Sequence, residues 1–467
     1  MRRERMLIIT YDYPPALSGV RRMVKFAKFL PEFGIDPIIL TTLPLRAFPQ
    51  DWEAMAEVEA AGYPIYRTPS LDPHYLRGRV AEVPAQLRRW RESLLKILNA
   101  PPSPDELRQL EQEGADSATS RKPFVSHKSD AQVGGKPRLT TRCAHLVRRW
   151  LYLPDTRFAW LPHAISQAEL ILEREPVRYV LTTSFPNTTH LIGRWIARRY
   201  RVKWVADFRD GWTQNPYFAD YPTPLHRRVN RNWERSVVHE ASAVLGVSEP
   251  IVRHLQRLTP EPEKVHLLPN GFDPDDFENV EPIAFDRFTI AYTGTLFMQR
   301  SPESFFAGVR ALLDNYRGIE ENFQVIFMTQ FRPEHEECIW AMGLERVVQN
   351  WGLQSYRKAL QLQKSADALL VLEGEGKNAE IMITQKVFEY LATGKPILAI
   401  SPPNALTSLL QETGAGVSVH PDDIRKIKDR LYELFTGTLT LRRNKEKIQR
   451  FHRKELTRRL VEIIQDR

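Results

Sequence analysis

The chain has 467 residues, of which 42% are hydrophobic and 10% aromatic, so it can bury the cores of two or three domains. Two cysteines, Cys143 and Cys338, lie far apart and lack metal-ligand spacing, which excludes a disulfide framework and favours a reducing compartment. The net charge of +9 suits an anionic substrate, an anionic membrane surface or nucleic acid, and does not choose among them.

No apolar run is long enough to cross a bilayer. The first residues, MRRERMLIITYDYPP, are too short and too quickly interrupted by an aspartate and two prolines for a signal peptide. We therefore expect a cytoplasmic protein.

Residues 6–10 predict a buried strand, which leads into a loop from Tyr11 to Val20. Gly19 in this loop permits close approach of a backbone. A helical apolar face then ends at Gly34, and residues 37–42 predict the next strand. The loop is not a GxGxxG sequence, so no dinucleotide fingerprint is present.

A basic amphipathic segment is predicted from about 80 to 100, with leucines and Trp90 on one side and arginines largely on the other. Residues 100–140 are rich in Pro, Ser, Gly and Gln, which predicts a mobile basic insertion at about 80–150. The amphipathic segment is either the solvated face of a surface helix or a helix that docks reversibly on an anionic membrane.

Strands are predicted again after Pro154, at 177–184, 202–206, 243–247 and 265–268. Polar residues follow these strands where the loops of one sheet edge converge. They are Ser184, the Asp207-Phe208-Arg209-Asp210 sequence and Asn270.

An acidic, proline-containing boundary at 274–286 separates this half from a second alternation of strands and helices. We predict an α/β fold with two Rossmann-like, doubly wound domains, at 1–275 and 286–440. Residues 441–467 are expected to form a helix that packs back on the N-terminal domain.

Residues 365–403 predict a strand, a glycine-containing loop, a helix and a second strand. Thr384 is the expected N-cap of this helix, and Gly394 its C-cap. Such a loop at a helix N-terminus is a natural seat for a phosphate, although strand-loop-helix units with a glycine occur in every α/β protein. Glu389 is expected opposite the apolar face, where its carboxylate could accept from two ribose hydroxyls.

Four motifs together resemble the retaining glycosyltransferases of family 4, which have the GT-B fold of two Rossmann-like domains that face each other across a cleft. The resemblance spans nearly the whole chain apart from the insertion. The motifs are the Tyr-Pro-Pro-x-x-x-Gly loop, Gly246–Glu249 followed by Leu268–Asp273, Tyr292–Thr295 with Arg300, and Lys386–Pro396.

The resemblance implies that the C-terminal half holds a sugar nucleotide. Gly294 and Arg300 would then lie near the diphosphate, Gly374 and Gly376 near the donor sugar, and Glu389 on the ribose. Thr295, Glu375 and Lys386 are the other candidates for donor binding. A fixed guanidinium and helix N-terminal amides would stabilise the departing diphosphate without a metal ion. Arg300 by itself could equally be an ordinary surface arginine.

The N-terminal half would hold the acceptor. Asp207, Arg209 and Asp210 are the candidate catalytic residues, and Gly19, Ser184 and Asn270 would line the acceptor side. The two carboxylates could position an acceptor hydroxyl or receive its proton. They could equally form a structural pair with the arginine.

The chain departs from the family pattern at two positions. Ile381 stands where the first Glu of the Glu-x7-Glu motif is expected, with Glu380 and Glu375 nearby, and Arg209 replaces a histidine that many members have before the aspartate. Either the glycine-containing loop that carries Glu375 and Glu380 is re-registered so that one of these carboxylates reaches the sugar, or that role is lost.

The resemblance therefore implies a metal-independent hexosyltransferase without a bound cofactor. It would transfer sugar from a nucleotide-sugar, expected to be a UDP- or GDP-sugar, to a hydroxyl of a cell-surface glycan or glycolipid, with contact to the inner face of the plasma membrane. A nucleotide-sugar epimerase, a GT-B protein that binds nucleotide without transfer, and a nucleic-acid-binding protein are the alternatives. No feature selects the base, the sugar or the acceptor.

Overall fold

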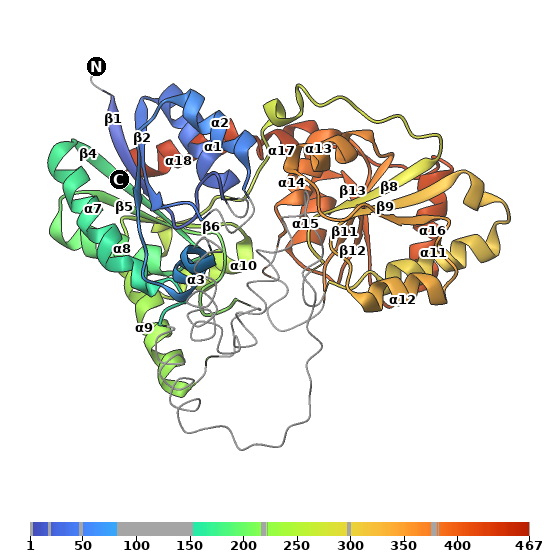
Figure 1. Cartoon of the computed structure of the whole chain (residues 1–467), viewed down its shortest axis with the longest axis horizontal. Coiled ribbons are helices and arrows are strands. Elements are labelled where there is room, and N and C mark those ends of the chain that lie inside the picture. The colour runs from blue at the N-terminus through green and yellow to red at the C-terminus, as the bar shows by residue number, and fades with distance from the viewer. Residues whose placement is uncertain are drawn as a thin grey trace, which may run out of the picture.

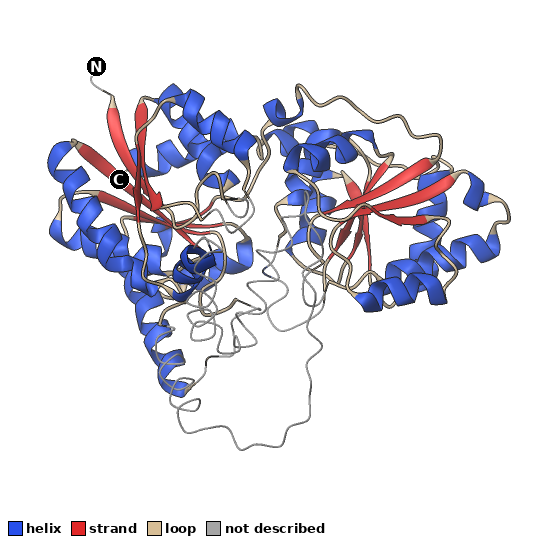
Figure 2. Ribbon diagram, viewed as in Figure 1, coloured by secondary structure: helices blue, strands red, loops and turns tan. Residues whose placement is uncertain are grey.

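The computed structural model describes residues 3–16, 20–45, 50–81, 153–215, 221, 223–296, 300–374, 381 and 383–466. Its strands form two parallel sheets, each covered by helices on both faces (Figures 1 and 2). The predicted pair of doubly wound α/β domains is confirmed.

The N-terminal sheet has seven strands in the order β3-β2-β1-β4-β5-β6-β7. The strands are β1 (Glu4–Ile9), β2 (Ile35–Thr42), β3 (Ile65–Thr68), β4 (Val177–Ser184), β5 (Lys203–Phe208), β6 (Ala243–Gly246) and β7 (Val265–Leu267). The helices around this sheet are α1 (Arg21–Phe29), α2 (Trp52–Ala61), α3 (Pro73–Ala81), α7 (Leu161–Arg174), α8 (Thr188–Arg199), α9 (Pro224–Glu240) and α10 (Glu249–Gln256).

The C-terminal sheet has six strands in the order β10-β9-β8-β11-β12-β13. The strands are β8 (Phe288–Thr293), β9 (Phe323–Met328), β10 (Val348–Asn350), β11 (Ala368–Leu372), β12 (Ile397–Ile400) and β13 (Gly416–Val419). The remaining helices are α11 (Glu303–Asn315), α12 (Pro333–Ala341), α13 (Tyr356–Ser365), α14 (Lys386–Thr393), α15 (Ala405–Thr413), α16 (Ile424–Phe435), α17 (Lys445–Gln449) and α18 (Arg453–Gln465).

Alternation along β1 shows how each sheet buries both faces. Leu7 and Ile9 pack in a cluster with α7, α8 and α10, whereas Met6 and Ile8 pack in a second cluster with α1 and α18. The last helix, α18, thus lies on the N-terminal sheet, and both chain ends are found on that body in Figure 1. A backbone bond from Phe272 N to Phe451 O, 3.0 Å long, ties the start of α18 to the end of the N-terminal half.

Two predicted helix starts are wrong. The residue that caps α14 is Gln385 and not Thr384, and the cap forms no side-chain hydrogen bond. The Ser301-Pro302 sequence predicts a helix with the proline at its first position, but Pro302 is the N-cap of α11 and the helix begins at Glu303. The C-cap at Gly394 is confirmed, with a φ of 78° that favours glycine.

No helix among the described residues is long and apolar enough to cross a membrane. The basic insertion lies almost wholly outside the described ranges, since only its start is included, as the end of α3.

Candidate functional site

The ends of β4 and β5 bring together three of the predicted residues. Arg209 and Asp210 follow β5 directly, and their side chains form an ion pair with Nε and Oδ2 3.5 Å apart. The Arg209 guanidinium also donates to the Phe185 carbonyl at 3.3 Å, and Ser184 Oγ lies 3.5 Å from the Asp210 carbonyl. The Asp210 side chain keeps 30% of its surface exposed, so its carboxylate is accessible.

Asp207 lies apart from this accessible group. Its side chain has no exposed surface, and both of its oxygens accept from the Arg22 guanidinium, at 2.8 and 3.0 Å. Thr183 Oγ1 donates to the same carboxylate at 2.8 Å. Asp207 is thus held in a buried ion pair with Arg22, whereas the structural alternative drawn from the sequence paired the two aspartates with Arg209.

Asn270 contacts the same guanidinium. Arg22 donates to Asn270 Oδ1 at 3.3 Å and to the carbonyls of Pro269 and Leu268, both at 2.8 Å. Charge-assisted bonds of this kind fix the loop that ends the N-terminal half.

Asp12 was missed by the sequence reasoning. It follows β1 and is half-buried, and burial raises its pKa although the charges of Arg157 and Arg209 oppose this effect. A carboxyl with a raised pKa beside a ligand site is a candidate proton acceptor. Its position after a buried parallel strand was the available signal, the same one that identified Asp210.

In the C-terminal half, Gly294 and Lys386 lie together. Gly294 has a φ of 98°, and a Cβ atom there would lie 2.8 Å from Lys386 Nζ. The same ammonium lies 4.0 Å from the centre of the Tyr292 ring, whose hydroxyl donates to the Thr295 carbonyl at 2.9 Å. The end of β8 and the N-terminus of α14 therefore converge on one cationic position.

Arg300 forms an ion pair with Glu373, which directly follows β11. The guanidinium donates from two nitrogens to the two carboxylate oxygens, at 3.0 and 3.1 Å, and both side chains are largely buried. This two-point pair orients the guanidinium. Gly374 follows immediately, whereas Glu375, Gly376 and Gly19 lie outside the described residues.

Glu389 is covered, although the helical period places it away from the apolar stripe of α14. Only 8% of the residue is exposed, because α13 packs over α14. Its carboxylate accepts from Tyr356 Oη at 3.3 Å and from Gln363 Nε2 at 3.2 Å. Burial raises the pKa of Glu389, and the hydrogen bond from Gln363 only partly offsets this effect.

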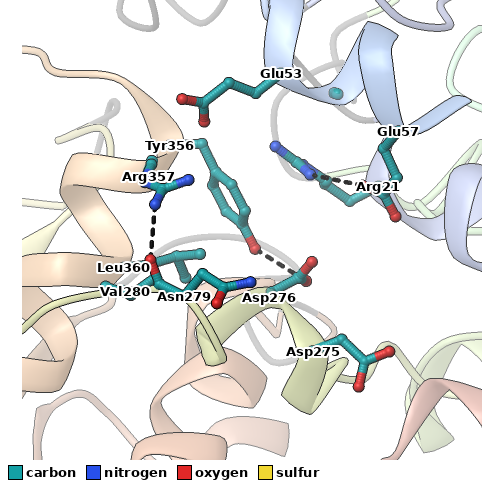
Figure 3. A pocket seen from close by; sticks show the side chains of 11 residues that line it. Arg21, Glu53, Glu57, Asp275, Asp276, Asn279, Val280, Tyr356, Arg357 and Leu360 are labelled. Atoms are coloured by element: carbon teal, nitrogen blue, oxygen red, sulfur yellow. Dashed lines mark hydrogen bonds and ion pairs between the residues drawn. The ribbon is translucent and has the colours of Figure 1, made fainter. Parts of the chain in front are cut away.

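Tyr356 also connects the two halves. The Arg21 guanidinium of α1 stacks 3.7 Å from the centre of the Tyr356 ring. Figure 3 shows both side chains at a pocket of about 160 Å³, with Asp276 beneath the tyrosine hydroxyl. The pocket is rimmed by charges of both signs, including Glu53, Glu57 and Arg357.

Arg453 of α18 is a second residue that sequence reasoning missed. It is 1% exposed, donates to Gln385 Oε1 at 3.0 Å, and has one terminal nitrogen without a hydrogen-bond partner. Gln385 in turn donates to the Gly271 carbonyl at 2.9 Å. No local pattern in the sequence indicates that an arginine near the chain end lies at the contact between the two halves.

Among the described residues, no group of three or more His, Cys, Asp or Glu side chains is placed to hold a metal ion.

The first prediction contrasts the two aspartates after β5. Asp207→Asn should lower the free energy of unfolding by about 3–5 kcal/mol, because it leaves the buried Arg22 charge without its partner. Asp210→Asn is the matched control at an accessible position, and should cost less than about 1 kcal/mol. Urea denaturation of both variants measures the difference, and equal costs would contradict a bracing role for Asp207.

The second prediction concerns the pH dependence of stability. A carboxyl with a raised folded-state pKa favours folding when protonated, so its contribution is present below its ordinary pKa of 4.5 and is lost as pH rises through the folded value. Glu389→Gln removes that loss. The variant should therefore gain stability relative to the wild type between pH 4 and pH 8, by on the order of 1 kcal/mol.

Urea midpoints at the two pH values measure this gain. Glu334→Gln, at a side chain that is 69% exposed, is the control and should show no such change. A gap between Glu389→Gln and wild type that is constant with pH would contradict the prediction.

Comparisons with known proteins bear on the fold and on one segment of the chain. Residues 124–271 match the family model described as glycosyl transferase 4-like domain. No curated protein is matched by the chain in sequence.

Solved structures resemble the chain over its whole length. The N-terminal domain of Candida albicans trehalose-6-phosphate phosphatase superposes with a TM-score of 0.61 at 13% identity, covering 100% of this chain and 97% of that one. Sucrose-phosphate synthase from Thermosynechococcus elongatus gives 0.57 at 12% identity, with 99% of both chains covered. Anabaena HepE in complex with UDP gives 0.55 at 12% identity, covering 99% and 100%. The chain therefore has the GT-B fold and carries a glycosyl transferase 4-like domain.

Proposed function

We propose that the protein is a retaining glycosyltransferase that moves a hexose from a nucleotide-sugar to an acceptor hydroxyl. The observation that carries the proposal is the closeness of Lys386 to Gly294, where the end of β8 meets the start of α14. The Arg300 guanidinium, oriented by Glu373, and the accessible Asp210 after β5 are the other charged groups that the proposal uses. The glycosyl transferase 4-like match supports the same reaction class.

The proposed donor site uses the positive charge at β8 and α14. A departing nucleoside diphosphate gains negative charge, which the Lys386 ammonium, the Arg300 guanidinium and the amides at the start of α14 would stabilise. These groups would take the role of a metal ion. UDP is the nucleotide to test first, because the similar Anabaena structure is described as a complex with UDP.

Glu389 is proposed to accept hydrogen bonds from the ribose. Its contacts to Tyr356 and Gln363 are at the long end of the hydrogen-bond range, 3.3 and 3.2 Å. Ribose hydroxyls would replace the Tyr356 hydroxyl, so that nucleotide binding and the position of Tyr356 are coupled.

On the acceptor side, Asp210 is the proposed proton acceptor, with Arg209 holding its orientation and Asp12 as the second carboxylate near the same guanidinium. The hydroxyl would attack from the face that the diphosphate leaves, so no protein nucleophile is assigned. A cell-surface glycan or glycolipid is the proposed acceptor class.

A second candidate is a protein that binds nucleotide without transferring sugar. It is favoured by one observation: Ile381, at the position of an expected carboxylate, is buried and has no polar atoms on its side chain. Donor hydrolysis or transfer by the wild type would exclude this candidate.

The third prediction is on nucleotide affinity. Calorimetry with UDP-, GDP-, ADP- and dTDP-sugars should find one nucleotide class that binds, and Glu389→Gln should weaken its binding by about 1–3 kcal/mol. Asp210→Asn should bind the same donor normally and lose transfer. Unchanged affinity in a folded Glu389→Gln variant would remove Glu389 from the site.

The fourth prediction concerns the insertion, for which we propose a contact with the inner face of the plasma membrane. The full chain should sediment with anionic liposomes at low salt, and deletion of residues 80–150 should abolish this. Neutral liposomes are the control. If the full chain stays in the supernatant and the deletion leaves acceptor use unchanged, the contact does not exist.

A further inference from the structure

Ile381 stands in the C-terminal half of the chain, between β11 and α14, but its side chain belongs to the core of the N-terminal half. It is 2% exposed. Every other buried member of its apolar cluster among the described residues lies between Leu7 and Val265, including Phe208, Trp212 and Val247. One residue of the donor half is thus inserted into the acceptor half.

Gly211 makes room for this side chain. A Cβ atom at Gly211 would lie 2.9 Å from Ile381 Cδ1, closer than Cβ contacts in proteins. The backbone of Gly211 is outside the left-handed region, so space and not conformation requires the glycine. Gly211 directly follows Asp210, so the isoleucine touches the loop that carries the accessible carboxylate.

Hydrogen bonds hold both ends of the same short segment. Ser248 Oγ donates to the Ile381 carbonyl at 2.9 Å, and Gln385 Nε2 donates to the Gly271 carbonyl at 2.9 Å. Gln385 is itself held by Arg453. Lys386, the cationic residue at the start of α14, comes next in the chain, so the anchors on the N-terminal half end one residue before it.

We propose that Ile381 is a positioning residue: seated against Gly211, it holds the N-terminus of α14 to the Arg209–Asp210 loop, so that the two half-sites assemble as one. The effect of Ile381 on catalysis rests on the proposed transferase function, whereas the packing of Ile381 against Gly211, called the seat below, does not. An apolar side chain suits this place because burying a carboxylate among apolar side chains costs free energy.

Hydrogen exchange in the full chain tests the seat without any substrate. Ile381→Ala should speed amide exchange in the peptide covering residues 208–215 by roughly tenfold, because the loop loses its contact from the other half. Ile319→Ala is the matched control, since Ile319 is buried within the C-terminal core alone. If the 208–215 peptide exchanges at the wild-type rate in Ile381→Ala, the seat is refuted.

A pair of variants tests the contact itself. Gly211→Ala should also speed exchange at 208–215, because its methyl group collides with Ile381 Cδ1. Ile381→Val lacks that atom, so the Gly211→Ala/Ile381→Val double variant should exchange more slowly than Gly211→Ala alone. Additive effects of the two substitutions would overturn the direct contact.

Steady-state kinetics separates positioning from mere packing. Ile381→Ala should lower kcat by about tenfold with little change in the donor KM, because each half-site stays intact and only their alignment is lost. Ile381→Val should recover most of the activity. Normal kcat in Ile381→Ala, with fast exchange at 208–215, would overturn the positioning role.

A nucleotide readout keeps the two proposals distinguishable. UDP should slow exchange of the 208–215 peptide in the wild type, and this effect should vanish in Ile381→Ala while UDP binding persists. Persistence of the effect in Ile381→Ala would refute coupling through this residue. Absence of any nucleotide binding or transfer in the wild type would overturn the proposed function, and ligand-free exchange would still decide the seat.

Discussion

The buried ion pair between Arg22 and Asp207 is the interaction on which the N-terminal half depends. It joins the first helix to the end of strand β5, and the same guanidinium donates to the carbonyls of Leu268 and Pro269. Removing two such charges from water is costly. The pair is stable because every nitrogen of the Arg22 guanidinium donates a hydrogen bond. The loop after β5 is thereby fixed, so the backbone that carries Asp210 is held in place.

Charge also fixes the join between the halves. Lys25 and Lys28 of α1 bind Asp273 and the acidic residues that follow it in the linker, and the Arg21 guanidinium stacks on Tyr356 of α13. The start of the linker is therefore attached to the first helix, whereas its later residues contact α13, as in the bond from Ile283 N to Ser365 Oγ at 2.7 Å. Part of this attachment is buried, since the Lys25 side chain is 3% exposed and that of Asp273 0%.

Much of the fold could be predicted from the sequence because buried parallel strands are short apolar runs. The strand predicted at 177–184 is confirmed residue for residue. The environment of a single side chain could not be read in this way. Glu389 follows the helical period away from the apolar stripe, yet α13 covers it, a tertiary contact that no periodicity contains. Asp207 and Asp210 look alike in sequence and differ in burial. Arg453 reaches the contact between the two halves only because α18 returns to the first domain.

The two departures from the family pattern are adjacent in space. Arg209, where a histidine is common, and Ile381, where a carboxylate is common, lie on loops that meet, since Ile381 packs on Gly211 two residues after the arginine. A carboxylate at 381 would bring its charge into the apolar cluster around Trp212, where burial penalises the charged form. The replacement of a carboxylate by Ile381 and the apolar contact of Ile381 with Gly211 are thus a single change in how the half-sites meet.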